Sequence, residues 1–402
     1  MQVKHLSLTN FRNYARLELA LPSPRTVIQG DNAQGKTNLL ESIYMLATTR
    51  SHRAGMEREL ISWEAVKEGQ PWARIAAQVE RAGGTLQVEI ALSTAEAAVS
   101  YSPSGRHGAA LGQVQKRIRI NGLPRRALDL VGQVNVVMFS SDDIATISGA
   151  PAWRRRYLNL TLSQIDRRYL RALQRYARVL AQRNHLLKLV REGRATPHEL
   201  DFWDRELVEN GAYLTVERQR AIASLEGLAR RIHRDLTAGR EELCLAYIAS
   251  AAQGHGEGAS AGLAEPEVAR LLSQGLGAAR DREVAAGASL VGPHRDDLRF
   301  LCHGVDMGIY GSRGQQRTVA LSLKLAEAEF MLSRSGETPV LLLDDVLSEL
   351  DKPRRRHLLS SLAGCQVLIT TTDLDPFEAS FLAQATVLQV SEGRVDPACT
   401  TT

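Results

Sequence analysis

One stretch of eight residues restricts the possible folds of this chain more than any other part of the sequence. Residues 30–37 read Gly-Asp-Asn-Ala-Gln-Gly-Lys-Thr and fit the pattern GxxxxGK(S/T) in full. The strand-forming triplet Thr26-Val27-Ile28 precedes this loop, and residues 38–45 carry apolar side chains at helical spacing. A glycine-rich loop between a strand and a helix lets backbone N–H groups surround phosphate oxygens, and the helix start adds positive partial charge. The sequence therefore predicts an α/β fold with a phosphate-binding loop.

The motif assigns a role to each part of this loop. Lys36 reaches the outer phosphates of a nucleotide, and the hydroxyl of Thr37 binds Mg²⁺, so the predicted cofactors are ATP and Mg²⁺. An ordinary glycine-rich turn is the alternative, but it does not account for the strand before the loop and the helix after it. The residues predicted to contact the nucleotide here are Gly30, Asp31, Asn32, Ala33, Gln34, Gly35, Lys36, Thr37 and Asn38.

A second stretch supplies two acids. Residues 340–343 form an uninterrupted apolar run, Val-Leu-Leu-Leu, that ends in Asp344 and Asp345. Such a run is typical of a buried parallel strand, and α/β sheets bind ligands at the carboxyl ends of these strands. We predict that Asp344 binds Mg²⁺ with Thr37, and that Asp345 is catalytic with Lys36 and orients or deprotonates the attacking water. Acids also follow strands without any function, but a complete phosphate loop elsewhere in the chain disfavours that interpretation.

A third stretch separates this chain from other proteins with a phosphate loop. Residues 312–316, Ser-Arg-Gly-Gln-Gln, precede an amphipathic segment from Thr318 to Met331. They match the S-x-G-Q core of the signature of ABC ATPases, in which small residues at a helix N-terminus receive a γ-phosphate from the nucleotide of the partner subunit. Residues 348–351, Ser-Glu-Leu-Asp, resemble the D-loop of that class. The signature residues predicted to contact nucleotide are Ser312, Gly314 and Gln315.

Hydrophobic periodicity changes along the chain. Residues 1–21 predict two strands joined by a turn at 10–13, and Asn121-Gly122 predicts a hairpin. Residues 153–236 contain few helix breakers and predict a long helical insertion, whereas Gly254 to Gly262 predict a flexible loop. The predicted fold is an ABC-type ATPase head with an inserted, mainly helical domain. Its predicted domains are residues 1–145 with 288–402 for the two lobes of the head, and residues 146–287 for the insertion.

Positive charge is concentrated in the predicted insertion. The net charge is +5, yet residues 154–194 contain twelve Lys and Arg residues against only Asp166 and Glu192. A local basic segment indicates a polyanionic partner such as DNA, although a solvated charged helix face is the simpler alternative. We predict that four arginines form one basic stripe, while Tyr169, Leu173, Tyr176 and Leu180 form the packed face. The four predicted DNA-binding residues are Arg168, Arg171, Arg175 and Arg178.

The four cysteines and the apolar segments bear on where the chain acts. Cys244, Cys302, Cys365 and Cys399 form no CxxC pair and have no nearby histidine at zinc spacing, so the sequence predicts neither a disulfide framework nor a metal site. No secretory signal and no uncharged stretch long enough for a bilayer is apparent. We therefore expect a cytoplasmic protein with no membrane partner.

Motifs along almost the whole chain resemble the RecF family of bacterial recombinational-repair ATPases, which have an SMC-like head. The resemblance covers residues 8–14, the phosphate loop, residues 137–143, Gly149-Ala150-Pro151 followed by Arg154-Arg155, residues 292–298 and residues 345–351, all in that family's order. Two positions depart from the family pattern, with Ser141 in place of proline and Asn159 in place of aspartate. Neither position belongs to the nucleotide motifs.

The resemblance implies more than the residues do by themselves. It implies weak, DNA-stimulated ATP hydrolysis, an ATP-dependent homodimer, and binding to gapped, single-stranded and duplex DNA. It also implies cooperation with RecO and RecR in loading RecA during recombinational repair, replication restart and SOS induction. By analogy with SMC-like heads, Arg12 and Asn13 contact the nucleotide, although a charged turn is an equally good interpretation of these two residues.

Three other functions compete with this interpretation. A transporter ATPase subunit is disfavoured because Thr371, Thr372 and Asp373 lie where transporters place a switch histidine, and because the chain has a basic helical insertion. A structural SMC protein requires long heptad arms, and no such repeat is present. A DNA-binding scaffold with a degenerate phosphate loop is disfavoured because Lys36, Thr37, Asp344 and Ser312 are all retained.

Overall fold

The structure is a computed structural model that describes residues 1–94, 114–252 and 262–397. Its packing divides the chain into two compact units. The first unit comprises Met1–Ser141 and Met331–Thr402, and the second comprises Asp142–Phe330. The domain boundaries predicted from the sequence, at 145/146 and 287/288, stay a prediction, because a unit of packing and a domain with its own function need not share boundaries.

The first unit contains an antiparallel sheet of six strands in the order β2-β1-β4-β5-β6-β7. The turn at residues 10–13 joins β1 to β2, and Asn121-Gly122 joins β6 to β7, so both predicted turns are confirmed. Asn121 and Gly122 both have positive φ, as a type I′ hairpin turn requires. The strands are β1 (Gln2–Phe11), β2 (Tyr14–Ala20), β4 (Trp72–Arg81), β5 (Gly84–Thr94), β6 (Val114–Ile120) and β7 (Leu123–Arg125).

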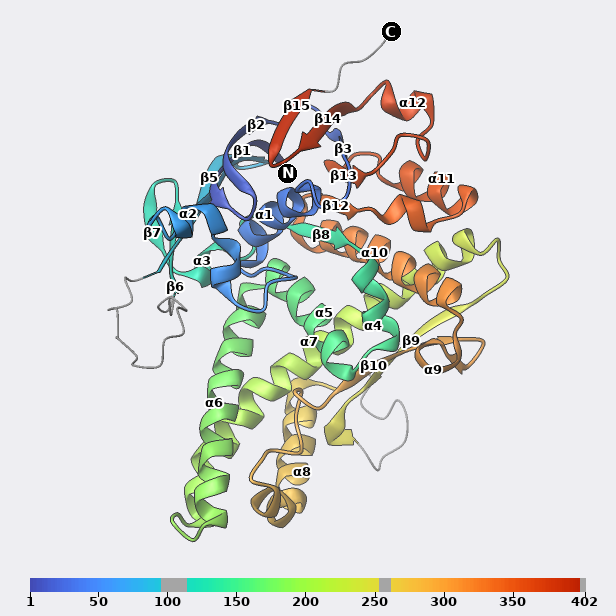
Figure 1. Ribbon diagram of the computed structural model, residues 1–402. Helices are drawn as coiled ribbons and strands as arrows, with labels where there is room; N and C mark the ends of the chain where they lie inside the picture. Colours follow the sequence, from blue (N-terminus) through green and yellow to red (C-terminus); the bar gives the residue numbers. More distant parts are fainter. Residues whose placement is uncertain (95–113, 253–261, 398–402) are drawn as a thin grey trace, which may run out of the picture. The chain divides into compact units, whose positions relative to one another are not determined.

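A second sheet of the first unit has the order β15-β14-β3-β13-β12-β8 (Figure 1). The five strands from β14 to β8 pair in parallel, and β15 pairs antiparallel with β14. The strand predicted at residues 340–343 is β12, which lies between two parallel neighbours and is buried from Val340 to Leu343. The strands are β3 (Arg25–Gln29), β8 (Val136–Phe139), β12 (Val340–Asp344), β13 (Val367–Thr371), β14 (Thr386–Ser391) and β15 (Arg394–Pro397).

Helix α1 (Lys36–Thr48) packs against strands of both sheets. Eleven of its residues are buried, so it is enclosed nearly all round, as expected for a helix in the interior of a domain. Leu39, Leu40 and Ile43 share one core with Leu8 of β1 and Leu342 of β12. This packing fixes the start of α1 relative to the carboxyl ends of the parallel strands. The other helices of the first unit are α2 (Trp63–Lys67), α3 (Ala127–Leu130), α11 (Lys352–Ser361) and α12 (Ala379–Leu382).

The second unit is mainly helical, with one antiparallel sheet in the order β11-β10-β9. The predicted long helical segment is confirmed, and it is divided by Asp166 and by residues 192–199 into α5, α6 and α7. The backbone N–H groups of Arg168 and Tyr169 donate to the side chain of Asp166, which therefore caps α6. The elements are α4 (Ile144–Ser148), α5 (Pro151–Ile165), α6 (Arg167–Arg191), α7 (Leu200–Leu236), β9 (Leu243–Ile248), α8 (Glu265–Ala286), β10 (Asp297–Cys302), β11 (Val305–Asp306), α9 (Met307–Tyr310) and α10 (Arg313–Ser335), whose last turn belongs to the first unit.

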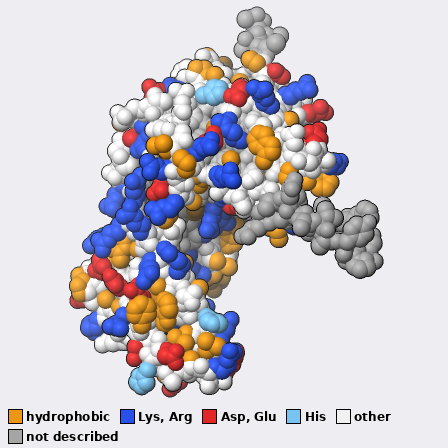
Figure 2. All heavy atoms as spheres, turned by 90° about the vertical axis from the view of Figure 1, so that its left-hand side faces the viewer, with side chains coloured by type: hydrophobic (Ala, Val, Ile, Leu, Met, Phe, Trp, Pro, Cys, Tyr) orange, Lys and Arg blue, Asp and Glu red, His pale blue; other side chains and the backbone are white. Residues whose placement is uncertain are grey.

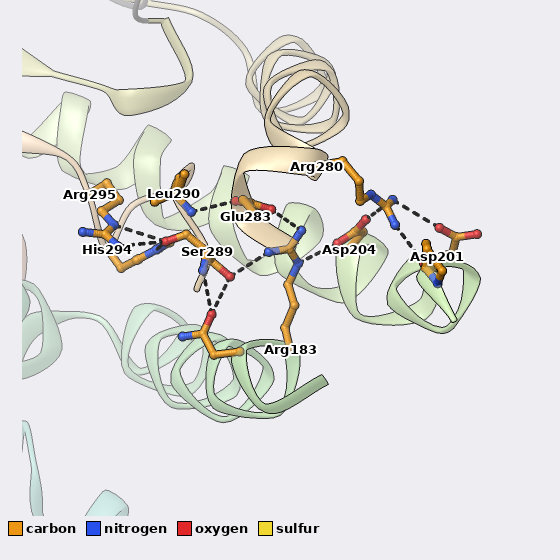
Figure 3. Close-up of polar contacts among 11 residues, drawn as sticks. Arg183, Asp201, Asp204, Arg280, Glu283, Ser289, Leu290, His294 and Arg295 are labelled. Atoms are coloured by element: carbon orange, nitrogen blue, oxygen red, sulfur yellow. Dashed lines mark hydrogen bonds and ion pairs between the residues drawn. The ribbon is translucent and has the colours of Figure 1, made fainter. Parts of the chain in front are cut away.

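A buried ion network joins α6, α7 and α8 inside the second unit (Figure 3). The guanidinium of Arg183 donates to Asp204 at 2.6 Å, to Glu283 at 2.6 Å and to the Ser289 hydroxyl at 2.7 Å. The side chains of Arg183 and Glu283 are both fully buried. On the other side of Asp204, Arg280 donates to its second carboxylate oxygen at 2.6 Å. One arginine from α6 therefore links the two other helices of the network.

Among the described residues, no helix is both long and apolar enough to cross a membrane. The flexible loop predicted from Gly254 to Gly262 lies, apart from Gly262, outside the described residues. Cys244, Cys302 and Cys365 are free thiols, and Cys399 lies outside the described residues.

Candidate nucleotide site

The phosphate loop runs from the end of β3 into the first turn of α1. Two of its glycines approach other backbone or side-chain atoms so closely that a Cβ does not fit. At Gly35, where φ is +118°, a Cβ would lie 2.6 Å from Asn13 Nδ2. At Gly30 it would lie 2.4 Å from the carbonyl oxygen of Val390. These positions need glycine because the loop is held tightly between β14 and the turn that joins β1 to β2.

Lys36 is buried at the start of α1, with 7% of its surface exposed. Its Nζ donates to two carbonyl oxygens of its own loop, those of Gly30 at 2.6 Å and Asp31 at 2.8 Å. Burial lowers the pKa of Lys36, and the nearby carboxylates of Asp345, Asp344 and Asp31 oppose that effect. The amine is therefore a desolvated cation close to three carboxylates. Two carbonyl groups of the phosphate loop hold it in place.

Thr37, at the end of the phosphate loop, and Asp344, at the end of the acidic strand, are in contact. The sequence predicted that these two side chains would lie close together. The Thr37 hydroxyl donates to Asp344 Oδ1 at 2.8 Å. The Thr370 hydroxyl at the end of β13 donates to the same oxygen at 2.8 Å, and it accepts from the backbone N–H of Asp345 at 3.0 Å. Thr370 lies between the two motifs because β13 lies between β3 and β12. Sequence reasoning missed this residue, although a threonine one position before the expected switch segment is a signal that could have identified it.

Asp345 has left-handed backbone geometry, with φ at +53°. Aspartate adopts this conformation more readily than most residues other than glycine, and non-glycine residues in it cluster at functional sites. Burial raises the pKa of Asp345, with further contributions from Asp344 and Asp373, while Ser348 and Lys36 act in the opposite direction. The carboxyl group therefore binds a proton more readily than an ordinary aspartate.

Arg12 and Asn13 lie in the turn between β1 and β2, beside the phosphate loop. The Arg12 guanidinium donates to both oxygens of Glu41 on α1, at 2.9 and 2.8 Å. Burial favours a high pKa for Glu41, but the hydrogen bonds from Arg12 and Ser51 outweigh it and lower the pKa. Asn13 donates to the Gln34 carbonyl at 2.8 Å and accepts from Asn38 at 2.8 Å. Arg12 thus has a structural role at α1, and contact of either residue with nucleotide stays a prediction.

The hairpin of β14 and β15 also holds the phosphate loop, which the sequence did not indicate. The backbone N–H of Glu392 donates to Gln34 Oε1 at 2.7 Å, and the N–H of Gly393 donates to the Gln34 carbonyl at 3.1 Å. These contacts join residues 358 and 359 positions apart, so no local pattern could reveal them. Asp31, Asn32 and Ala33 are left exposed at the tip of the loop.

The predicted signature lies in the second unit, at the first turn of α10. Ser312 and Gln315 form a reciprocal cap: the Ser312 N–H donates to Gln315 Oε1 at 3.0 Å, and the Gln315 N–H donates to Ser312 Oγ at 3.3 Å. Ser312 and Gly314 are exposed, and a Cβ added at Gly314 would meet no atom within 4 Å. The motif therefore presents an accessible helix N-terminus. Gln315 Nε2 is bonded to Glu241 at 2.9 Å.

Two of the family-like motifs meet inside the second unit. Arg154, from the segment after Gly149-Ala150-Pro151, donates to both oxygens of Asp297 at 2.6 and 3.0 Å. The amide oxygen of Asn159 accepts from Tyr169 at 2.8 Å and from Arg218 at 2.9 Å. Asparagine thus supplies the acceptor at the position where the family pattern has aspartate.

The predicted basic stripe on α6 is exposed at all four arginines. Neighbouring helices nevertheless supply acids that α6 itself lacks near the stripe. Arg175 donates to Glu206 of α7 at 2.9 Å, and Arg168 lies 3.9 Å from Glu265 of α8 and over the ring of Tyr213. Figure 2 likewise shows acidic side chains among the many Lys and Arg side chains on the face that it draws.

The packed face of α6 also differs from the prediction. Tyr169 and Tyr176 are buried, whereas Leu173 and Leu180 are only half-buried. Four other positions complete the buried face, and these are Leu170, Val179, Arg183 and Leu187.

Comparison with known proteins defines the class first. Residues 2–394 match the family model described as RecF/RecN/SMC N terminal domain. The Smc head domain of Pyrococcus furiosus shares the fold, with a TM-score of 0.52 at 16% identity over 98% of this chain and 95% of that one. Fold and site thus define an ABC-type ATPase head of the SMC kind, and the predicted fold class is confirmed.

Full-length relatives then identify the family within that class. The chain is 47% identical to the DNA replication and repair protein RecF of Chloroflexus aurantiacus over 98% of this chain and 99% of that protein. It is 38% identical to the protein of the same name from Bacillus cereus, over 98% of each chain. The solved structure of the recombination mediator protein RecF with ATP in the RecFOR pathway matches with a TM-score of 0.84, at 31% identity over 99% of this chain and 97% of that one. The chain belongs to the RecF family.

Proposed function

We propose that this chain is an ATP-binding DNA replication and repair protein that acts in the cytoplasm. The observation that carries the proposal is the convergence, at one edge of a parallel sheet, of a buried lysine, the Thr37–Asp344 hydrogen bond and Asp345. Full-length relatives bear the name DNA replication and repair protein RecF, and a solved relative is described with ATP. A transporter subunit is not favoured by these relatives.

The residues present fit ATP and Mg²⁺. Backbone N–H groups at the start of α1 and the Lys36 amine would hold the phosphates, as in other phosphate loops. Thr37 and Asp344 would hold Mg²⁺, because a hydroxyl and a carboxylate oxygen 2.8 Å apart are hard oxygen ligands from two elements. Bound Mg²⁺ supplies neutralisation of phosphate charge. The predicted contacts of Gly30 to Asn38, Arg12 and Asn13 belong to the same proposal.

Asp345 is proposed as the residue that orients the attacking water and accepts its proton. Because the pKa of Asp345 is raised, the carboxylate is lost on acidification at a higher pH than for an ordinary aspartate. The rate of hydrolysis is therefore expected to fall as the pH falls through that range. We propose that turnover is weak and is stimulated by DNA.

The proposed active form is a homodimer assembled by ATP. Ser312, Gly314 and Gln315 of one subunit would contact the nucleotide held by the phosphate loop of its partner. An exposed, capped helix N-terminus is suited to a phosphate group. A site divided between two subunits couples ATP binding to assembly, since neither subunit alone offers both halves.

DNA is the proposed polyanionic partner, with Arg168, Arg171, Arg175 and Arg178 as candidate phosphate contacts. Gapped, single-stranded and duplex DNA are all candidate forms, and RecO and RecR are candidate protein partners, because the solved relative is described in the RecFOR pathway. The proposed role is to promote RecA loading in recombinational repair, replication restart and SOS induction.

The test compares binding of gapped, single-stranded and duplex DNA to the full chain, with and without ATP, by filter binding. ATP hydrolysis is measured in the same buffers. The proposal expects ATP to strengthen DNA binding and DNA to raise the hydrolysis rate. Equal binding with and without ATP, together with hydrolysis unaffected by any of the three DNAs, would contradict it.

A further inference from the structure

Three potential metal ligands meet in the second unit, whereas the phosphate loop and its acids belong to the first. They are His233 near the end of α7, Glu241 in the link to β9, and Cys302 at the end of β10. One ligand atom of each lies within 4.8 Å of the other two. His233 Nε2 is 3.1 Å from Glu241 Oε2 and 3.8 Å from Cys302 Sγ. His233 and Cys302 are buried, and Glu241 is 22% exposed.

Hydrogen-bond direction fixes which nitrogen of His233 carries a proton. The Ser322 hydroxyl lies 2.7 Å from the Thr318 carbonyl, and a carbonyl only accepts, so the single hydroxyl hydrogen lies between these two oxygens. Ser322 Oγ must then accept from the nitrogen 3.0 Å away, which makes His233 Nδ1 the donor. In a neutral imidazole the other nitrogen, Nε2, bears a lone pair. That lone pair faces a carboxylate oxygen and a sulfur atom.

Lone pairs on two atoms 3.1 Å apart repel each other unless a proton or a metal cation lies between them. A proton is one solution, and it would give either a buried imidazolium at His233 or a protonated carboxyl at Glu241. A metal cation is the other solution, and the two separations from Nε2 are close to those that it requires. Zinc bonds of about 2.0–2.3 Å at tetrahedral angles place neighbouring ligand atoms about 3.3–3.8 Å apart. The observed separations from Nε2, 3.1 and 3.8 Å, lie close to that range.

The surroundings of the three ligands follow the pattern that metal ligands usually have. A metal-bound histidine generally donates its other N–H to an oxygen, and His233 Nδ1 does so to Ser322. A bound carboxylate is generally held by a further donor, and Gln315 Nε2 donates to the second oxygen of Glu241 at 2.9 Å. Ser322 and Gln315 both belong to α10, the helix that begins with the signature.

The geometry points to a binding site for a divalent transition-metal ion of the zinc class, held by His233 Nε2, Glu241 and the thiolate of Cys302. Imidazole and thiolate ligands together favour zinc and related ions over Mg²⁺ or Ca²⁺. Partial exposure of Glu241 places the site next to solvent, from which a water molecule could supply a fourth ligand. Binding releases the thiol proton of Cys302 to solvent, because the ligand is the thiolate. The ion would also hold the carboxylate that bonds the signature glutamine.

The test uses the full chain after treatment with a chelator and dialysis. Zn²⁺ is titrated by isothermal calorimetry, and Co²⁺ is added to report thiolate ligation through its charge-transfer absorption. The unchanged chain is expected to bind about one Zn²⁺ and to show the thiolate band with Co²⁺. Cys302→Ser should weaken Zn²⁺ binding by about tenfold or more and remove the band. Cys365→Ser is the matched control, since it removes a free thiol of the first unit and should change neither.

Two results would overturn the assignment. One is a Co²⁺ spectrum of the unchanged chain without a thiolate band. That result would mean that a proton, not a metal ion, lies between His233 and Glu241. It does not depend on whether any variant folds. The other is a folded Cys302→Ser chain that binds Zn²⁺ as tightly as the parent.

Discussion

Lys36 shows how one residue combines opposing requirements. The amine is buried, which disfavours its charge, yet three nearby carboxylates and two loop carbonyls favour it. Such a cation is ready to contact phosphate with little further loss of hydration. The backbone carbonyls that it contacts hold it in place, so its position does not depend on side-chain conformations elsewhere.

Lys36→Ala is expected to lose most ATP affinity. A charge-assisted hydrogen bond contributes about 1.5–3 kcal/mol, so affinity should fall by about tenfold to a hundredfold. Equilibrium dialysis with ATP measures this change. Lys67→Ala, which removes an exposed lysine of the same unit, should bind like the parent. Equal affinity in the two variants would show that the phosphate loop is not the nucleotide site.

His294 is a residue of the second unit whose titration bears on stability. The Tyr176 hydroxyl donates to His294 Nδ1 at 2.6 Å, and Nε2 donates to the Ser289 carbonyl at 3.1 Å, so the ring is neutral in this network. Burial lowers the pKa of His294 from 6.5 to about 4, and Arg295, Arg155 and Arg183 add to the effect. The folded chain therefore resists protonation of this ring.

Acidification is expected to destabilise the chain through this histidine. Between about pH 6.5 and about pH 4 the unfolded chain binds a proton here that the folded chain does not, so the free energy of unfolding falls as the pH falls. The full loss is about 3 kcal/mol. Urea denaturation at about pH 7 and about pH 5 tests this in the parent and in His294→Gln, whose pH dependence should be flatter. His185→Gln, an exposed histidine on α6, should keep the parental dependence.

At the scale of elements, one buried arginine of α6 forms ion pairs with acids of both α7 and α8. Arg183 supplies the charge for Glu283, and neither side chain is exposed. Removing one partner of a buried pair leaves the other charge without compensation, and that costs more than the pair itself contributes.

Arg183→Ala is expected to lower the free energy of unfolding by about 3–5 kcal/mol. Arg171→Ala is the matched control, because this arginine of the same helix is exposed and its loss should change stability by less than about 0.5 kcal/mol. Urea denaturation followed by circular dichroism measures both. Equal stability of the two variants would mean that the network does not hold the helices together.

The basic stripe on α6 is expected to contribute to DNA binding. Replacing Arg171, Arg175 and Arg178 by alanine should weaken DNA binding across sequences, and the log–log salt slope should fall by about 0.9 per lost duplex phosphate contact. ATP binding should persist. Arg175→Ala alone should have less effect than Arg171→Ala, because Arg175 is already paired with Glu206.

The control for the stripe removes the same charge from another helix. Arg220, Arg230 and Arg234 are exposed on α7, and their replacement by alanine should leave the salt slope closer to that of the parent. If the two triple variants lost affinity equally, net charge rather than the stripe would explain the binding. Unchanged affinity in a folded stripe variant would place the DNA path elsewhere.

For the whole molecule, the phosphate loop and the signature belong to different compact units. The loop and its acids belong to the first unit, and Ser312 to Gln315 belong to the second. In the proposed dimer, each nucleotide is held by one copy's loop and completed by the other copy's signature. Assembly and hydrolysis should therefore be separable by mutation.

Ser312→Arg is expected to leave ATP binding to the monomer nearly unchanged and to block ATP-induced dimerisation, because a large cation would replace a small, exposed residue at the shared site. Asp345→Asn should slow turnover and prolong the ATP-bound dimer. Light scattering with ATP measures both. Ser333→Arg places the same charge at an exposed position near the other end of α10 and should dimerise normally. Normal dimerisation by Ser312→Arg would exclude the shared site.

Local sequence determined the parts of this protein that depend on short-range geometry. The phosphate loop, the acidic strand and the hairpin turn at Asn121-Gly122 were predictable because glycine, apolar runs and polar strand ends act within a few residues. The RecF family was also identifiable, because ordered motifs extend along almost the whole chain.

Only the tertiary structure decided which distant residues complete each site. Thr370 contacts Asp344 because β13 lies beside β12, and the Glu392 turn contacts Gln34 because β14 lies beside β3. Glu206 pairs with Arg175 through the packing of α7 on α6, and His233, Glu241 and Cys302 meet from three elements. Sequence spacing carries no information on such contacts, since they depend on which strands and helices become neighbours during packing rather than on intervals along the chain.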